Sequence, residues 1–169
     1  MLELIEKIGI HQAIEKSMGK AAKNKDAVAE AIENNVRTTM KSQQANDPAF
    51  YGRMSEALDA IISLRKKKSL SYENYLERIA ELARQMTQKT DDTTPKDLDT
   101  LGKRVLWSNL NGDVSLALKI DATVKQVRPD GWRGVQAKEQ LIKAALFGLL
   151  QDPAEVERIF PILVAQPEY

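Results

Sequence analysis

The chain has 169 residues, of which 43% are hydrophobic and 29% charged, and its formal net charge is +1. This length is enough for one domain, or a tightly joined pair, with a real buried core. The absence of cysteine excludes a disulfide framework, a thiolate nucleophile and a Cys-ligated zinc site, and the absence of a long apolar run or a signal-peptide pattern predicts a cytoplasmic protein without a membrane partner.

Apolar residues recur at helical spacing through the first half of the chain. Asp47 and Pro48 have the character of a helix cap and a first helical residue, and Ser71 is predicted to cap the following helix. Four helices are predicted here, over residues 4–19, 26–44, 48 to the basic run at 65, and from 72 to 86.

Residues 87–95 are polar and have no periodicity, so they are predicted to be a linker between an N-terminal half, 1–86, and a C-terminal half, 96–169. Thr94 and Pro95 are expected to open the next helix, and Asn111–Gly112 to end it. Three more helices follow, with their apolar positions at 114–124, 141–150 and 156–163. The helix at 141–150 is the most apolar and is expected to be central in its half, whereas Pro161 should kink or shorten the last helix.

The whole chain is therefore predicted to be all-α, an irregular multi-helix bundle of about seven or eight helices in two packed halves.

The segment 128–134 places a Trp and an Arg between two glycines. Pro129, Asp130 and Gly131 indicate a tight turn, and Gly134 marks a second bend. Trp and Arg often dominate interface energies, and a rigid turn lowers the entropy lost on binding. The hypothesis is a partner-binding corner made by Asp130, Trp132, Arg133 and Lys138. The alternative is that the Trp packs over a neighbouring helix and the Arg caps its carbonyl groups.

Cations gather in a four-residue run at 65–68 and between residues 119 and 143, where six cations face three acids. A DNA-contacting basic helical module is one interpretation, because lysine and arginine neutralise phosphates. The other interpretation of the run is a solvated helix end whose charges complement the helix dipole. The residues predicted as possible DNA contacts are Arg65, Lys66, Lys67, Lys68, Lys125 and Arg128.

Groups for catalysis are scarce. His11 is the single histidine, and no lysine has an acid two residues before it, as a common type of Mg²⁺-dependent nuclease requires. The pairs Gly19–Lys20 and Gly102–Lys103 lack the other residues of a phosphate-binding loop. No catalytic residue, metal site or cofactor is therefore predicted for this chain. A stand-alone enzyme ranks third among the functions considered.

Several segments, in this order and spacing, together resemble the C-terminal helical region of the R subunit of type I restriction-modification enzymes. They are 34–37 (NNVR), 47–58 (DPAFYGRMSEAL), 71–83 (SYENYLERIAELA), 130–134 (DGWRG) with Lys138–Glu139, and the closing 156–159 and 165–169. The sequence departs from the family pattern at Gly52, Trp107 and Pro161.

The resemblance implies a non-catalytic assembly domain that docks the R subunit onto the methyltransferase core of M and S subunits. The resemblance also implies a parent enzyme that uses ATP and Mg²⁺, in which an N-terminal nuclease domain cleaves foreign DNA and two motor domains hydrolyse ATP to translocate it. The implied partners are the M and S subunits, the parent's own motor domains, and DNA in the full complex.

Overall fold

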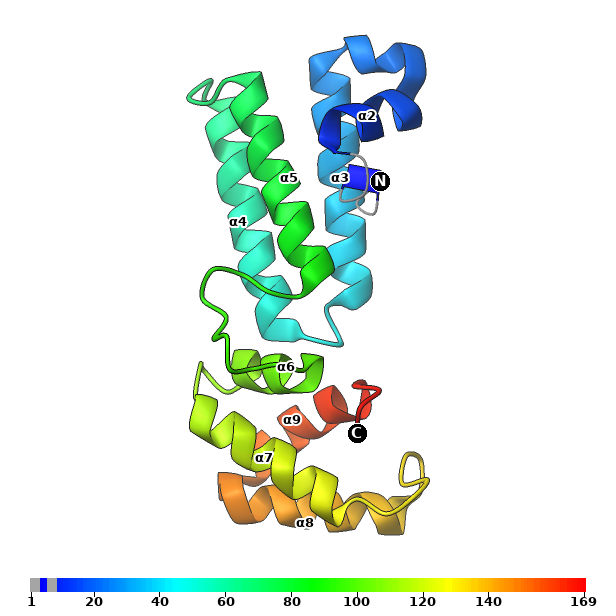
Figure 1. The fold of residues 1–169 in the computed structure, drawn as a ribbon, viewed down its shortest axis with the longest axis vertical. Coiled ribbons are helices and arrows are strands. Elements are labelled where there is room, and N and C mark those ends of the chain that lie inside the picture. Colours follow the sequence, from blue (N-terminus) through cyan, green and yellow to red (C-terminus); the bar gives the residue numbers. More distant parts are fainter. Residues whose placement is uncertain (1–3, 6–8) are drawn as a thin grey trace. The chain divides into compact units, whose positions relative to one another are not determined.

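The computed structural model describes residues 4–5 and 9–169, and within these ranges it contains helices and no strand (Figure 1). The elements are α2 (Ile10–Met18), the short 3-10 helix η1 (Gly19–Lys23), α3 (Lys25–Gln43), α4 (Pro48–Lys66), α5 (Tyr72–Gln88), α6 (Leu101–Asn109), α7 (Val114–Val127), α8 (Gln136–Leu150) and α9 (Pro153–Val164). The predicted all-α fold is confirmed. None of the helices in the described ranges is long and apolar enough to cross a membrane.

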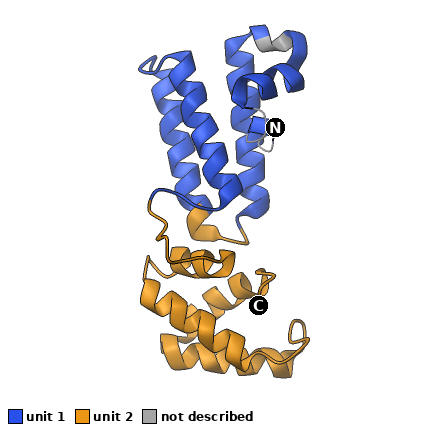
Figure 2. Cartoon of the chain, viewed as in Figure 1, with its two compact units in different colours: residues 1–44, 51–92 blue, residues 45–50, 93–169 orange. Residues whose placement is uncertain are grey.

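The chain divides into two compact units (Figure 2). Unit 1 contains residues 1–44 and 51–92, and unit 2 contains residues 45–50 and 93–169. The division after residue 92 falls inside the predicted linker, but α5 runs on to Gln88, so the linker begins later than predicted. No local pattern predicts that residues 45–50 belong with unit 2.

Buried polar groups explain that assignment of residues 45–50. Asp47 Oδ1 accepts hydrogen bonds from Phe50 N at 3.1 Å and from Asn109 Nδ2 at 2.7 Å. Gln166 Nε2 donates to Asn46 O at 2.9 Å. Because Asp47, Asn109 and Gln166 are all buried, these bonds compensate the cost of removing their polar atoms from water.

In unit 1, the helices α3, α4 and α5 lie side by side (Figure 1). Their apolar stripes meet in a core that includes Ile32, Leu58 and Ile79. Ser71 caps α5 as predicted, with its side chain accepting from Asn74 N at 3.2 Å. The helix predicted from residue 4 falls partly on residues outside the described ranges, and α2 begins at Ile10.

Unit 2 is built from α6 to α9 around one apolar core. Its buried members are Leu98, Val105, Leu106, Trp107, Leu110, Ala117, Ile120, Val124, Trp132, Ile142, Leu146, Val156, Ile159, Phe160, Ile162, Leu163 and Tyr169. The predicted helix start at Thr94–Pro95 is wrong, because α6 begins at Leu101 behind Thr100. Thr100 Oγ1 also donates to Glu168 Oε1 at 2.8 Å, a distant partner that local sequence reasoning could not include.

The last helix, α9, does not stop at Pro161 but continues to Val164. Pro161 therefore does not shorten the helix, and the kink predicted as the other possibility stays a prediction. Proline removes one backbone donor, yet Ala165 N still donates to Pro161 O at 3.1 Å, so the ladder resumes after the proline.

Candidate functional site

The corner between α7 and α8 has the backbone that its glycines predicted. Gly131 and Gly134 have φ values of 57° and 75°, a region that residues with a Cβ rarely adopt. Gly134 N donates to Glu139 Oε1 at 2.8 Å, and Lys138 Nζ donates to Asp130 O at 2.5 Å. Side chains of the first turn of α8 therefore hold the corner in place.

Trp132 is part of the core of unit 2. Its side chain is only 3% exposed and meets Phe160 edge to face, with ring centres 5.9 Å apart. Its indole N–H donates to Tyr169 O at 2.8 Å. This position does not fit the docking role predicted for Trp132, because a partner cannot reach a side chain that the protein already covers. It fits the alternative, in which the Trp packs over a neighbouring helix.

Arg133 caps the end of α9. Its Nε donates to Val164 O at 3.0 Å and its Nη2 to Gln166 O at 2.6 Å, while the guanidinium lies 4.8 Å from the centre of the Trp132 ring. The last carbonyl groups of a helix have no partner within the helix, and a planar guanidinium can bind two acceptors at once. Arg133 thus joins the corner to the last helix.

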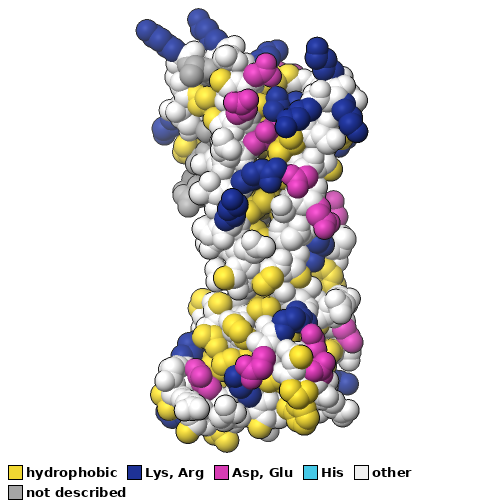
Figure 3. Space-filling view, turned by 180° about the vertical axis from the view of Figure 1, so that it is seen from behind, with side chains coloured by type: hydrophobic (Ala, Val, Ile, Leu, Met, Phe, Trp, Pro, Cys, Tyr) yellow, Lys and Arg dark blue, Asp and Glu magenta, His cyan; other side chains and the backbone are white. Residues whose placement is uncertain are grey.

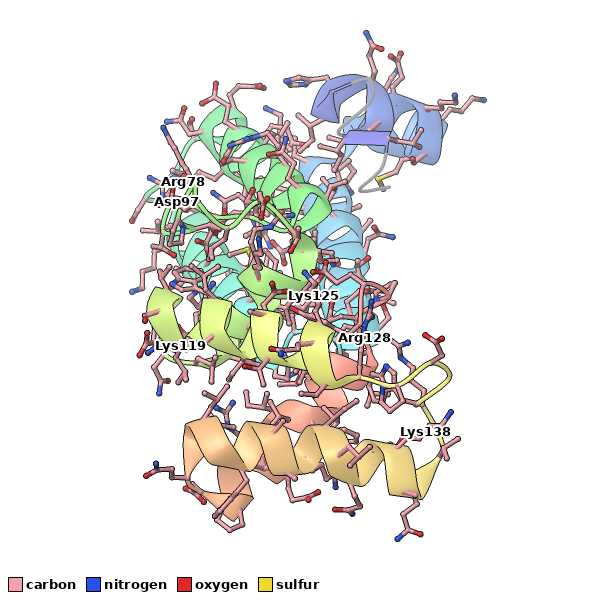
Figure 4. All side chains as sticks on the ribbon, turned by 60° about the horizontal axis from the view of Figure 1, so that its bottom comes forward. Arg78, Asp97, Lys119, Lys125, Arg128 and Lys138 are labelled. Atoms are coloured by element: carbon pink, nitrogen blue, oxygen red, sulfur yellow. The ribbon has the colours of Figure 1, made fainter. Side chains whose placement is uncertain are left out.

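Arg128 and Lys125, which the sequence suggested as DNA contacts, bind the closing residues of the chain instead. Arg128 Nη1 donates to Glu168 O at 2.8 Å and also to Tyr169 O. Lys125 forms an ion pair with Asp121 at 2.7 Å and lies 5.5 Å from the centre of the Tyr169 ring. Figure 4 shows Lys125 on α7, Arg128 just after that helix, and Lys138 near the start of α8.

The phenol of Tyr169 completes this arrangement. It donates to Asp121 Oδ1 at 2.7 Å. Burial raises the pKa of Tyr169 above its ordinary value, and the hydrogen bond to Asp121 raises it further. The phenol therefore remains a neutral donor. We call residues 164–169 the closing segment; hydrogen bonds to Val164, Gln166, Glu168 and Tyr169 hold it against the rest of unit 2.

Glu168 fixes the closing segment to the start of α6. Its carboxylate accepts from Thr100 Oγ1 and from Gly102 N, both at 2.8 Å. A Cβ added to Gly102 would lie 2.5 Å from Glu168 Oε1 and 2.8 Å from Tyr169 Cε2. Packing thus requires glycine at position 102, and the incomplete phosphate-loop pair Gly102–Lys103 in the sequence does not reveal this.

The corner leaves a hollow of about 260 Å³, lined by residues 128–133 and Tyr169. It brings together Arg128, Asp130, Trp132 and Arg133 of the predicted set, and Lys138 binds the backbone beside it. Both guanidinium groups already donate to main-chain oxygens. The hollow thus lies beside the hydrogen bonds that join the corner to the closing segment.

The basic run at the end of α4 divides into two kinds of residue. Arg65 is turned inward, with Nε 3.0 Å from Glu33 Oε1 and the guanidinium 5.6 Å from the centre of the Tyr75 ring. Its side chain is only 18% exposed. Lys66, Lys67 and Lys68 are exposed. The three lysines are thus available to an anionic partner, whereas Arg65 is engaged within unit 1.

The most exposed apolar surface in the described ranges lies on α8. Leu141 is 56% exposed and Phe147 48% exposed. Ala144 and Gly148, which are also exposed, lie on the same side of the helix. We call these four residues the apolar face of α8; Val135, 42% exposed, precedes the helix. Hydrophobic side chains are visible on the surface of unit 2 in Figure 3.

This apolar face corrects one sequence interpretation. The helix was expected to be central and covered on several sides, but only Ile142 and Leu146 are fully buried. A helix with apolar residues all round gives no periodicity from which the covered side can be read.

Within the described part of the chain, no group of three or more His, Cys, Asp or Glu side chains could hold a metal ion. His11 Nε2 lies 3.4 Å from Glu73 Oε2, and both side chains are well exposed. No family model matches the chain, and no curated protein or solved structure matches it either.

Proposed function

We propose that this chain is a helical assembly domain of a type I restriction endonuclease R subunit, and that it docks that subunit onto the methyltransferase core. The observation that supports docking is the apolar face of α8. Contiguous exposed apolar surface is costly in water and often marks an interaction site.

The four residues of the apolar face are well suited to receive a partner. Leu141 and Phe147 provide apolar area, and burying such a side chain fully stabilises a complex by about 1.5 to 3 kcal/mol. Ala144 and Gly148 have little or no side chain, so a partner backbone or ring can approach the helix closely. Lys138 and Glu139 tie the start of the helix to the backbone of the corner, which limits the entropy lost on binding.

The identity of the partner rests on the sequence resemblance. It names the M and S subunits as the core that is bound, with motor domains and DNA as further components of the complex. ATP and Mg²⁺ would be used by the motor domains of the parent, and this domain would contribute no catalytic group. The proposed location is the cytoplasm.

Binding to the M and S core of the same restriction system tests the proposal. The double variant Leu141→Gln/Phe147→Gln should weaken the affinity by about 30-fold or more, equivalent to roughly 2 kcal/mol, as measured by biolayer interferometry. Its urea unfolding midpoint should stay close to that of the unmodified protein, because both side chains are exposed already.

The matched control is Leu118→Gln, which replaces an exposed leucine of α7 that is 37% exposed and should leave the affinity unchanged. An unmodified protein that does not bind the core would overturn the proposal. So would a double variant that binds as tightly as the control.

A further inference from the structure

One end of unit 1 collects positive charge from segments distant in the sequence. Arg65 at the end of α4 lies 3.4 Å from Asp26 at the start of α3. Lys25 Nζ lies 4.8 Å from the centre of the Tyr72 ring at the start of α5. These contacts join the start of α3, which directly follows η1 in the chain, to the end of α4 and the start of α5. Figure 3 shows Lys and Arg side chains gathered around this end of the unit.

The charge balance at this end is strongly positive. Residues 19–26 and 65–73 contain six lysines and one arginine but only two acids, Asp26 and Glu73. Asp26 forms an ion pair with Arg65, and the carboxylate of Glu73 lies 3.4 Å from the imidazole of His11. The six exposed lysines, which we call the cationic end, are Lys20, Lys23, Lys25, Lys66, Lys67 and Lys68. In the described ranges no carboxylate forms an ion pair with any of them.

Helix stability explains only part of this set. Cations stabilise the C-terminus of a helix, which accounts for Lys66 at the end of α4 and for Lys20 and Lys23 in the last turn of η1. Lys25, by contrast, is the first residue of α3, where a positive charge opposes the helix dipole. Lys68 has a φ of 55°, a position where glycine would be less strained. The N-termini of α3 and α5 add further positive partial charge to the same end.

We propose that the cationic end binds the phosphodiester backbone of nucleic acid without reading its sequence. Duplex DNA carries one negative charge per about 1.7 Å of its axis. The axes of two adjacent helices are typically about 8 to 10 Å apart, so lysines from both helices can lie against phosphates of the same duplex. Lysine acts as a flexible point charge and suits phosphates at variable positions. This surface lies on unit 1 and does not depend on the docking proposed for unit 2.

Fluorescence anisotropy with a labelled short DNA duplex of arbitrary sequence tests the proposal. The unmodified protein should bind at low salt, and log K should fall linearly with log salt concentration. Two triple variants, Lys66→Gln/Lys67→Gln/Lys68→Gln and Lys20→Gln/Lys23→Gln/Lys25→Gln, should each weaken binding by about tenfold or more. Each should also reduce the magnitude of the salt slope by about 2 to 3, because each phosphate contact contributes about 0.9.

The charge-matched control is Lys41→Gln/Lys96→Gln/Lys119→Gln, which removes three exposed lysines elsewhere. It should retain the affinity and slope of the unmodified protein. Equal weakening by the control would overturn the proposal, because net charge alone would then explain binding. Absence of duplex binding at low salt would overturn it too, including the case in which the protein binds only vesicles of anionic lipid. The Leu141→Gln/Phe147→Gln variant should bind the duplex normally, which separates failure here from failure of the docking proposal.

Discussion

At the scale of single residues, the arginines of unit 2 act mainly as ligands of backbone oxygens. Arg128 and Arg133 each donate to two main-chain oxygens of the closing segment. Arg158 Nη2 donates to Asn109 O at 2.7 Å at the end of α6. At Arg133 a lysine could not reproduce the paired contacts, because Nε and Nη2 of one planar guanidinium bind two different oxygens. The guanidinium groups of these arginines thus form hydrogen bonds within unit 2.

Replacing glycine by alanine is expected to change the stability of the protein in opposite directions at two positions. Gly102→Ala should destabilise the protein by about 1 to 3 kcal/mol, because the new Cβ displaces Glu168 and the Tyr169 ring. Gly148→Ala should stabilise it by about 0.5 to 1 kcal/mol, because the site is open and alanine favours a helix. Urea unfolding of both variants provides the comparison. If Gly102→Ala were also stabilising, the packing of Glu168 against α6 would be incorrect.

At the scale of elements, α8 has two sides that differ in burial. Ile142 and Leu146 bury one side in the core, whereas Leu141 and Phe147 are exposed to solvent. The same helix is held at its start through Lys138 and Glu139, which bind the backbone of the corner. A surface presented on such a helix is fixed in shape before any partner arrives.

The sequence predicts helices well where the determining interactions are local. Asp47 and Ser71 cap their helices as expected, with bonds to backbone donors three residues away. It predicts poorly where the partner is distant. The burial of Trp132 depends on the closing segment, whose Tyr169 O accepts from the indole N–H, and no local pattern connects the two.

Two leucines of α8 test its orientation. Leu146→Ala should cost about 2 to 5 kcal/mol, since Leu146 is completely buried and its removal leaves a cavity. Leu141→Ala should change stability by about 0.5 kcal/mol or less, because its side chain is largely in solvent. Equilibrium unfolding in urea distinguishes the two. Equal losses would show that α8 is covered on both sides.

At the scale of the whole molecule, the two units offer surfaces of different chemistry. Unit 1 carries the cationic end, and unit 2 carries the apolar face of α8. These surfaces suit two kinds of partner, one polyanionic and one apolar. An assembly domain that contacts both a protein core and DNA would use such a division.

The purified chain is expected to have no nuclease or ATPase activity. The sequence lacks a phosphate-binding loop and an acid two residues before any lysine. Measurements of plasmid cleavage and of phosphate release with Mg²⁺ and ATP check this expectation. Activity that disappears with a point substitution in this chain would contradict it, whereas activity that persists in every variant would indicate a contaminant.

The attachment of the closing segment has a consequence for the order of folding. Its bonds join residues far apart in the sequence, with separations of 66 between Glu168 and Gly102 and 120 between Gln166 and Asn46. Chains generally fold from their N-terminus during synthesis, and the helices of unit 1 are complete by residue 88. The hydrogen bonds that residues 166–169 make within unit 2 cannot form until these residues have left the ribosome. Until then, the indole of Trp132 lacks the main-chain acceptor that it binds in the finished fold.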